Sequence, residues 1–590
     1  MTITVASGVT STSLTISSGD PLVVLSGGQV YSATILSGGS ATLSAGGLGI
    51  DLTVSKGGVV LGPGELAGVN VAAGAVSKVT VSGGGGLELL SGGRASGLTV
   101  EGGGLEIDAG GVATATTLDS DGTLAISSGG VASGGVVESA GVLLLSSGGT
   151  AVGLTVQAGG LLVYGGNLTQ NFTYDYGPMT GSAVLGGVTV SAGAGLEFAG
   201  PTVLSGVTLS LGSGTDVDGV TIAKGGRVLG TGELDGASTV SGSMSGVTLG
   251  GGAAIDAGGA TAHVIVESGG VETVSSGGRS SDDTIKTGGK EIVRSGGAAA
   301  GITVLSGGSV DVSLSGTTIG TALDSGGKQL VSSGGLASET TVLSGALAYI
   351  YSGGVGSGDT VEGGGIETIS SSGEVRGLTL VSGGVLVDSG EVRIAGAATL
   401  AGTLSGDGLI AQTAAGDLLL SGAGTAFGGG AVIEGGTIEL ATAGAIGSGY
   451  AQFMAPATGS AVLQIDAADA PVAGGTFANT IFDFSGSGED IDLRSIAYVA
   501  GASATVSGTT LVLTDGGKTY KFRLAGTVTG AYPVLSDGHG GTLIDPAVTR
   551  FTHHAAAFAP SDAAKTALVS STSPSDQTPF AHAAASPGRL

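Results

Sequence analysis

The sequence contains no cysteine and little charge, and each shortage argues against a class of protein. Without cysteine there are no disulfide bonds and no thiolate metal sites. Charged residues make up 11% of the 590 residues, and 46 acids against 19 bases give a net charge of −27. Because phosphate contacts need clustered lysine and arginine, this balance disfavours binding to nucleic acids and to anionic membrane surfaces.

Long apolar runs are also missing. No segment approaches the ~18 apolar residues that a membrane-spanning helix needs, so we expect no membrane insertion. Residues 1–7, Met-Thr-Ile-Thr-Val-Ala-Ser, have neither the basic start nor the apolar stretch of a secretory signal. If the protein leaves the cell, we expect either a signal outside this sequence or an export route that does not use one.

Glycine, in contrast, is abundant, at 123 of 590 residues. A collagen helix is excluded because glycine does not fall at every third position and proline is only 12 residues. Hydrophobic residues reach 41%, and Val, Leu, Ile and Thr recur in phase, so a regular apolar interior is available. The composition therefore predicts an ordered β-rich protein.

A Ser-Gly-Gly phrase organises the chain between residues 268 and 384. Successive copies are separated by 8 residues, by 11 residues or by sums of the two, which defines a 19-residue repeat with two turns per unit. A fixed period of this kind indicates a solenoid. The phrase begins at Ser268, Ser276, Ser295, Ser306, Ser325, Ser333, Ser352 and Ser382.

The segments between these turns are short and rich in β-branched residues, such as residues 301–305, Gly-Ile-Thr-Val-Leu. Bounded by glycine pairs, they predict a strand–turn–strand–turn unit. One such unit is too short to bury its own apolar face, so we expect parallel coils that stack on their neighbours. Roughly 390 residues would give about 20 coils and a length of about 95 Å.

The repeat and its interruptions divide the chain into four predicted parts. Residues 1–395 are the 19-residue-repeat solenoid, interrupted at about 161–250, and residues 396–475 are longer coils of the same kind. Residues 476–545 are a small β-rich C-terminal cap or secretion module, and residues 546–590 are a disordered tail. Aromatic residues gather at 171–178 in what we interpret as a loop, which either covers the core locally or makes contacts with a partner.

The phrase Thr-Val-x-Ser-Gly-Gly on this period, as at residues 303–308, resembles the passenger repeats of AIDA-type autotransporter adhesins over residues 1 to about 390. Residues 402–449 resemble the passenger-associated repeat of the same superfamily. The resemblance implies an all-β fold, a right-handed parallel β-helix (β-solenoid), displayed at or released from a bacterial surface. It also implies a role in adhesion, autoaggregation or biofilm formation.

Two features of that family differ here. Its members normally carry an N-terminal signal and a C-terminal outer-membrane translocator barrel, and neither is seen in this sequence. Residues 477–545 look similar instead to C-terminal regions of proteins exported without a cleaved signal, so we expect release. Some family members carry heptose on repeat serines, which implies O-glycosylation at Ser276, Ser295, Ser306, Ser325, Ser333 and Ser352.

An enzyme is the alternative that the fold leaves open, because parallel β-helices include polysaccharide lyases and hydrolases. Such a site needs converging carboxylates or basic residues in a cleft. The acids recur singly and are interpreted as the solvated face of each coil; they include Asp108, Glu138, Asp256, Glu267, Glu291, Asp311 and Asp324. We therefore expect no enzymatic activity, and a cleft with clustered carboxylates or arginine would favour the alternative.

Calcium is the best cofactor candidate. Residues 486–493, Gly-Ser-Gly-Glu-Asp-Ile-Asp-Leu, partly resemble the glycine-rich loop of calcium-binding β-rolls, with Asp490 and Asp492 as the ligands. Only one copy is present, and stacked copies share the oxygen ligands of each ion, so plain turn chemistry is the competing interpretation. No other cofactor is expected.

The sequence thus predicts an extracellular or surface-displayed structural protein of adhesin type. Binding would be spread over many coils. The expected partners are glycans or proteins on host or neighbouring cells, or further copies of the same chain.

Overall fold

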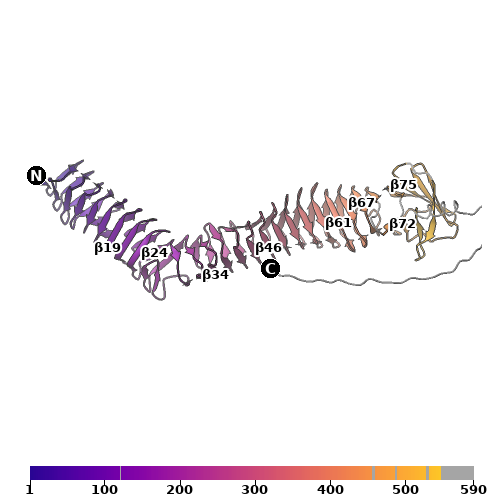
Figure 1. Cartoon of the computed structure of the whole chain (residues 1–590). Helices are drawn as coiled ribbons and strands as arrows, with labels where there is room; N and C mark the ends of the chain where they lie inside the picture. Colours follow the sequence, from indigo (N-terminus) through magenta and orange to yellow (C-terminus); the bar gives the residue numbers. More distant parts are fainter. Residues whose placement is uncertain (120, 455–458, 486–487, 527–529, 547–590) are drawn as a thin grey trace, which may run out of the picture.

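The computed structural model describes residues 1–119, 121–454, 459–485, 488–526 and 530–546. These residues wind into a parallel β-solenoid of about 24 turns, with antiparallel strands at its C-terminal end (Figure 1). The described residues contain no helix, and thus none long and apolar enough to cross a membrane. The predicted all-β solenoid is confirmed.

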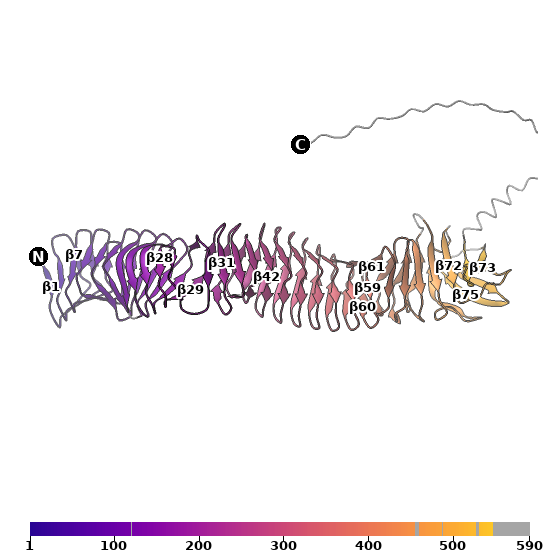
Figure 2. The ribbon, with the colours of Figure 1, turned by 90° about the horizontal axis from the view of Figure 1, so that it is seen from below.

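Each regular coil contains three short strands. In one coil these are β42 (Val271–Val274), β43 (Arg279–Ser281) and β44 (Thr284–Ile285). Each pairs in parallel with the strand 19 residues later, so that Val274 lies opposite Val293 and Ile285 opposite Val304. The repeat stacks these coils side by side along the molecule (Figure 2), and three ladders of strands form its walls.

The third corner of the coil is the part that the sequence did not predict. It lies between the second and third strands and recurs every 19 residues at a positive φ, for example 54° at His263, 57° at Asp282 and 56° at Glu339. The two-turn prediction missed it because glycine takes this position only in some coils, such as Gly301 and Gly320. Histidine, aspartate and glutamate adopt the left-handed conformation at this corner in place of glycine.

Alternate residues of each strand point into the coil, and five side chains per coil are buried, in addition to turn glycines. In one coil these are Val310, Val312, Thr318, Thr321 and Leu323, all at most 1% exposed. Because the register is constant, each inward side chain rests on its equivalent in the next coil. The interior is therefore a set of continuous columns, most of them apolar.

The solenoid bends between two arms (Figure 1). Among the described residues, one ladder of strands continues through the bend. This wall includes β24 (Leu161–Tyr164), β29 (Gly195–Ala199) and β32 (Asp216–Asp218). The other walls of the N-terminal arm end at β23 (Thr150–Val156) and β28 (Val188–Val190). Two new ladders begin with the strands β25 (Asn167–Leu168) and β26 (Phe172–Tyr174). The predicted interruption at 161–250 thus contains a change of walls.

An aromatic cluster fills the core at the bend. Phe198, on the continuous wall, makes edge-to-face contacts with Tyr164, Phe172 and Tyr174, at centroid distances of 6.0, 5.7 and 5.0 Å. The interpretation of residues 171–178 as a loop is therefore wrong for Phe172–Tyr174, which form strand β26 with the side chains of Phe172 and Tyr174 buried. Tyr176, in contrast, is 82% exposed.

Parallel stacking continues beyond residue 475. Strand β72 (Glu489–Leu493) is the last parallel strand of the continuous wall, and β78 (Thr542–Ile544) pairs with it in the antiparallel direction. The strands β73 (Ser503–Ser507), β74 (Thr510–Asp515) and β75 (Lys518–Leu524) form an antiparallel sheet that closes this end. Residues 547–590, in the predicted tail, lie outside the described residues.

Candidate functional site

The six serines predicted to carry sugar lie on the turn edges of the coils. All are exposed: Ser276, Ser295, Ser306, Ser325, Ser333 and Ser352. They form two rows, because the two Ser-Gly-Gly turns of a coil fall on different edges. Backbone hydrogen bonds join successive turns within a row, for example from Gly326 N–H to the Gly345 carbonyl at 2.9 Å. The serines are thus accessible on rigid edges, and their glycosylation stays a prediction.

Three of these serines, Ser306, Ser325 and Ser333, also have a packing role between coils. A Cβ placed on Gly345, which has a φ of +79°, would lie 2.6 Å from Ser325 Oγ of the preceding coil. The same geometry recurs at Gly326, where a Cβ would lie 2.7 Å from Ser306 Oγ. The serine of one coil therefore rests where the glycine of the next coil has no side chain.

Substitution of Gly345 by alanine should accordingly cost more than its backbone conformation alone requires. An L-residue at this φ costs about 1–2 kcal/mol, and Gly345→Ala adds the contact with Ser325. Gly377→Ala is the matched control, since Gly377 has a φ of +71° and nothing within 4 Å of its Cβ position. Urea unfolding should show a larger loss for Gly345→Ala, reduced when Ser325→Gly is added. Equal losses in both single variants would contradict the contact.

The two calcium candidates lie on strand β72, with their side chains on its outer face. Arg494 Nε donates to Asp492 Oδ2 at 2.9 Å, so this carboxylate has a cationic partner from the protein. Burial, followed by the charges of Asp545, Asp492 and Glu489, raises the pKa of Asp490 to about 6. Gly486, which begins the proposed loop, lies outside the described residues. Calcium at this pair stays a prediction.

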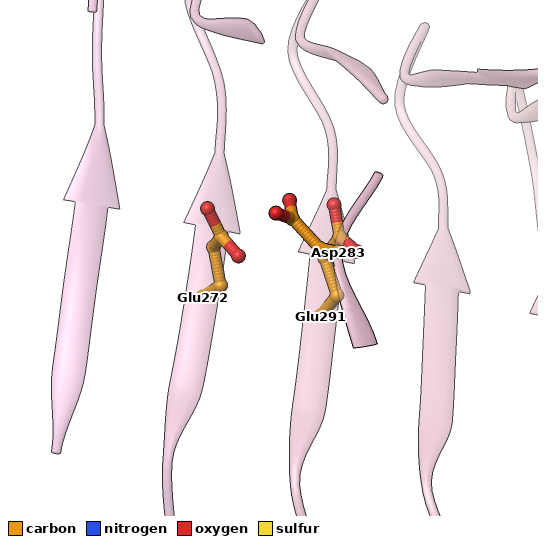
Figure 3. A group of neighbouring side chains, drawn as sticks. All are labelled: Glu272, Asp283 and Glu291. Atoms are coloured by element: carbon orange, nitrogen blue, oxygen red, sulfur yellow. The ribbon is translucent and has the colours of Figure 1, made fainter. Parts of the chain in front are cut away.

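The acids of the solenoid are not all on its solvated face. Glu291, interpreted above as a surface residue, is 0% exposed and points into the core, so that interpretation is wrong. It lies beside the equally buried Glu272 and Asp283, and the three carboxylates gather between neighbouring coils (Figure 3). Burial, followed by the neighbouring carboxylates, raises the pKa of all three groups.

Further along the same columns the core contains an amide and a second acid group. The Gln329 side chain donates to Thr318 Oγ1 and Thr321 Oγ1 at 3.3 and 3.2 Å, and accepts from Thr340 Oγ1 at 2.9 Å. Beyond it lie Asp359 and Glu367, which are at most 1% exposed. Burial raises the pKa of Asp359 to about 6 and that of Glu367 well above its usual range.

These inward acids were not predicted from the sequence, although their positions within the 19-residue period indicate that they point inward. Glu272, Glu291 and Glu367 share one column with Val310 and Ala348, which are buried. A residue at the same position of the 19-residue period must also point inward. An assignment by phase, rather than by charge, would have placed all three in the core.

Two hollows on the surface are relevant to function. One, of about 380 Å³, follows a turn edge and is lined by residues that include Glu267, Lys286 and the predicted sugar site Ser306. The other, of about 600 Å³, lies near the C-terminal end and includes Glu439, Asp466, Arg494 and His539. Burial, followed by a hydrogen bond with Asp466, raises the pKa of Glu439. Glu439 and Asp466 therefore form a carboxylate pair that lines a hollow open to solvent.

Comparison with known proteins bears on the repeat itself. Residues 245–308 match the family described as "Adhesin of bacterial autotransporter system, probable stalk". Among solved structures, a TibC-catalysed hyper-glycosylated TibA55-350 fragment is 23% identical, over 65% of this chain and 99% of that one, with a TM-score of 0.20. A TM-score this low does not establish a shared overall shape. No curated protein sequence matched the chain. Residues 245–308 are therefore the part of the chain for which the predicted resemblance to AIDA-type autotransporter adhesins is confirmed.

Proposed function

We propose that the chain is a secreted or surface-displayed bacterial adhesin-like protein. Its solenoid acts as a stiff rod, and the surfaces of its coils mediate adhesion, autoaggregation or biofilm formation. The partners are glycans or proteins of host or neighbouring cells, or further copies of this chain. The turn serines are the proposed sites of attached sugar.

The observation that carries this proposal is the constant register of the stack. From β47 (Thr303–Val304) onward, Val304, Leu323, Val342 and Val361 follow one another at 19-residue steps in one ladder. Such a stack presents the same edges and faces many times, which suits weak contacts that add up over a long surface. The match of residues 245–308 to an adhesin stalk supports the same function.

The alternative, a polysaccharide-active enzyme, has one observation in its favour. The hollow near the C-terminal end combines Glu439, Asp466 and Arg494 on one face, and paired carboxylates are the usual groups of glycoside hydrolysis. The buried group of Glu272, Asp283 and Glu291 cannot serve a polysaccharide, because all three side chains are enclosed in the core. The two functions can therefore be separated by variants at different places.

The experiment compares the full chain with a variant that lacks residues 308–345, which are two complete coils. Removing whole periods joins Gly307 to Ala346 and preserves the register of the ladders. Expressed in the native host, the shortened chain should mediate less cell aggregation and surface binding than the full chain. Thermal unfolding of the purified variant checks that it is folded, and the intact mass of each recovered protein reports sugar on the serines.

Glu439→Gln serves as the comparison within the hollow, and it should leave aggregation unchanged. Unchanged aggregation and binding after removal of the two coils would overturn the adhesin proposal. Release of sugar from a polysaccharide by the full chain, lost in Glu439→Gln, would establish the enzyme instead.

A further inference from the structure

The buried carboxylates of Glu272, Asp283 and Glu291 form a compact group within the coil stack. Glu272 comes from β42 and Glu291 from the adjacent β45 (Lys290–Val293), while Asp283 directly precedes β44 (Figure 3). One carboxylate oxygen from each lies within 4.8 Å of the corresponding oxygens of the other two. All three side chains are 0% exposed.

In each of the three carboxylates, one oxygen is held by the protein and the other has no partner. The Thr261 hydroxyl donates to Glu272 Oε1 and the Ser280 hydroxyl to Glu291 Oε1, both at 2.6 Å. The Val264 N–H donates to Asp283 Oδ1 at 2.7 Å. The remaining oxygens, Glu272 Oε2, Asp283 Oδ2 and Glu291 Oε2, are buried without a hydrogen-bond partner. Carboxylates that bind metal ions are commonly hydrogen-bonded in this way, because surrounding donors orient them through one oxygen and leave the other for the ion.

The protein supplies no positive charge to this group. Among the buried side chains of the described residues there is no lysine, arginine or histidine. Buried carboxylates are otherwise stable only when they are paired with a cation or protonated. The counter-charge must therefore come from outside the chain, as protons or as a metal ion.

We propose that this group binds one divalent cation of the oxygen-preferring class, such as Ca²⁺, inside the solenoid. Carboxylate and hydroxyl oxygens are the ligands of Ca²⁺, Mg²⁺ and Mn²⁺, whereas zinc and copper sites use histidine or cysteine. Glu272, Asp283 and Glu291 provide the ligand atoms. The hydroxyls of Thr261 and Ser280 orient two of them.

A site enclosed in this way takes up its ion while the coils stack. The coil walls separate the three carboxylates from solvent once neighbouring coils have paired, so an ion bound during folding has no exposed route of escape. Metal binding of this kind contributes to the stability of the folded state. It also distinguishes this ion from ions bound at the acidic surface, which a chelator removes from the native protein.

Four coils further on, the chain contains a similar buried acid group that lacks one of the three carboxylates and therefore serves as a natural control for the proposed site. Asp359 and Glu367 occupy the positions of Asp283 and Glu291, but Ala348 stands in place of Glu272 and Gly356 in place of Ser280. That pair lacks the third carboxylate. The double variant Glu272→Ala/Ser280→Gly copies this natural arrangement into the upstream site, and the downstream coils show that such a layer is compatible with the fold.

The test uses the full chain and Mn²⁺ as the probe. Protein unfolded in urea is refolded with Mn²⁺ or with EDTA and dialysed against EDTA, and its metal content is measured. The wild type refolded with Mn²⁺ should retain about one ion per chain and unfold at a higher urea concentration than the EDTA sample. The double variant and Asp283→Asn, which keeps the hydrogen-bonding oxygen, should retain no Mn²⁺ and show no difference between the samples.

Two results would overturn the site. One is a wild-type protein that folds equally well in EDTA and keeps no Mn²⁺ after dialysis. The other is retention of Mn²⁺ to the same extent in the wild type and in both variants.

Discussion

Replacement of Phe198 by alanine should uncouple the two arms of the solenoid. Phe198 is 2% exposed and is the central ring of the aromatic cluster at the bend. Deletion of a buried phenylalanine ring costs about 3–5 kcal/mol. Each coil of a solenoid is stabilised by its contacts with the neighbouring coils. A loss of this size at one layer therefore weakens the contacts that make the two arms unfold together. Thermal unfolding followed by circular dichroism should then separate into two steps.

Small-angle X-ray scattering provides a second measurement of the same variant. A loosened bend should broaden the distribution of distances within the molecule at temperatures where both arms remain folded. Tyr176→Ala is the control, since this tyrosine follows β26, which contributes Phe172 and Tyr174 to the cluster, but is itself 82% exposed. A single unfolding step and an unchanged scattering profile for Phe198→Ala would show that the backbone of the continuous wall alone holds the arms together.

Stability should fall as the pH rises from about 4 to 8, and the buried pair Asp359 and Glu367 should account for a measurable part of the fall. Burial raises the pKa of both groups in the folded state, while the unfolded chain has ordinary values near 4. The folded state therefore holds these protons more tightly. The stability they provide is complete below the unfolded pKa and is lost as the pH rises through the folded pKa.

The expected size of the effect follows from the change in the free energy of unfolding per pH unit. In the window between the two pKa values each such group lowers the free energy of unfolding by about 1.4 kcal/mol per pH unit. Asp388, whose pKa burial raises to about 7, acts in the same direction. Urea unfolding measured by circular dichroism at pH 5, 6, 7 and 8 should show midpoints that decrease steadily.

Glu367→Gln removes one titrating group and keeps its shape. This variant should have a flatter pH dependence than the wild type and a higher relative stability at pH 8. Glu339→Gln, at an exposed corner of the same region, should leave the pH dependence parallel to that of the wild type. The control matters because the net charge of −27 also opposes folding as acids ionise. Parallel curves for Glu367→Gln and the wild type would contradict the assignment.

The stacked-coil fold was predictable from the sequence because glycine turns and β-branched residues repeat with one period. Ser-Gly-Gly identifies two corners of the coil, where a glycine adopts a positive φ, as at Gly326 and Gly353. The third corner was not predictable from composition. His263, Asp282 and Glu339 all adopt its positive φ, and no common residue type connects them.

The buried acids were missed for a different reason. A single glutamate between polar turns looks like a surface residue, and only its position in the period shows that it points inward. The grouping of Glu272 with Asp283 also depends on the third corner. Asp283 follows this corner directly and lies beside Glu272 on β42. Distances of this kind follow from the three-strand coil and are not contained in the spacing of two turns.

The direction of the hydrogen bonds between coils has a mechanical consequence. These bonds run along the axis of the solenoid, so a pull on its two ends acts on the interfaces between coils in series, and each interface carries the full force. Each coil adds about 4.8 Å to the rod when stacked, but its 19 residues would span about 65 Å when drawn out. Under tension the molecule would lengthen by the release of successive coils, and each release would absorb work.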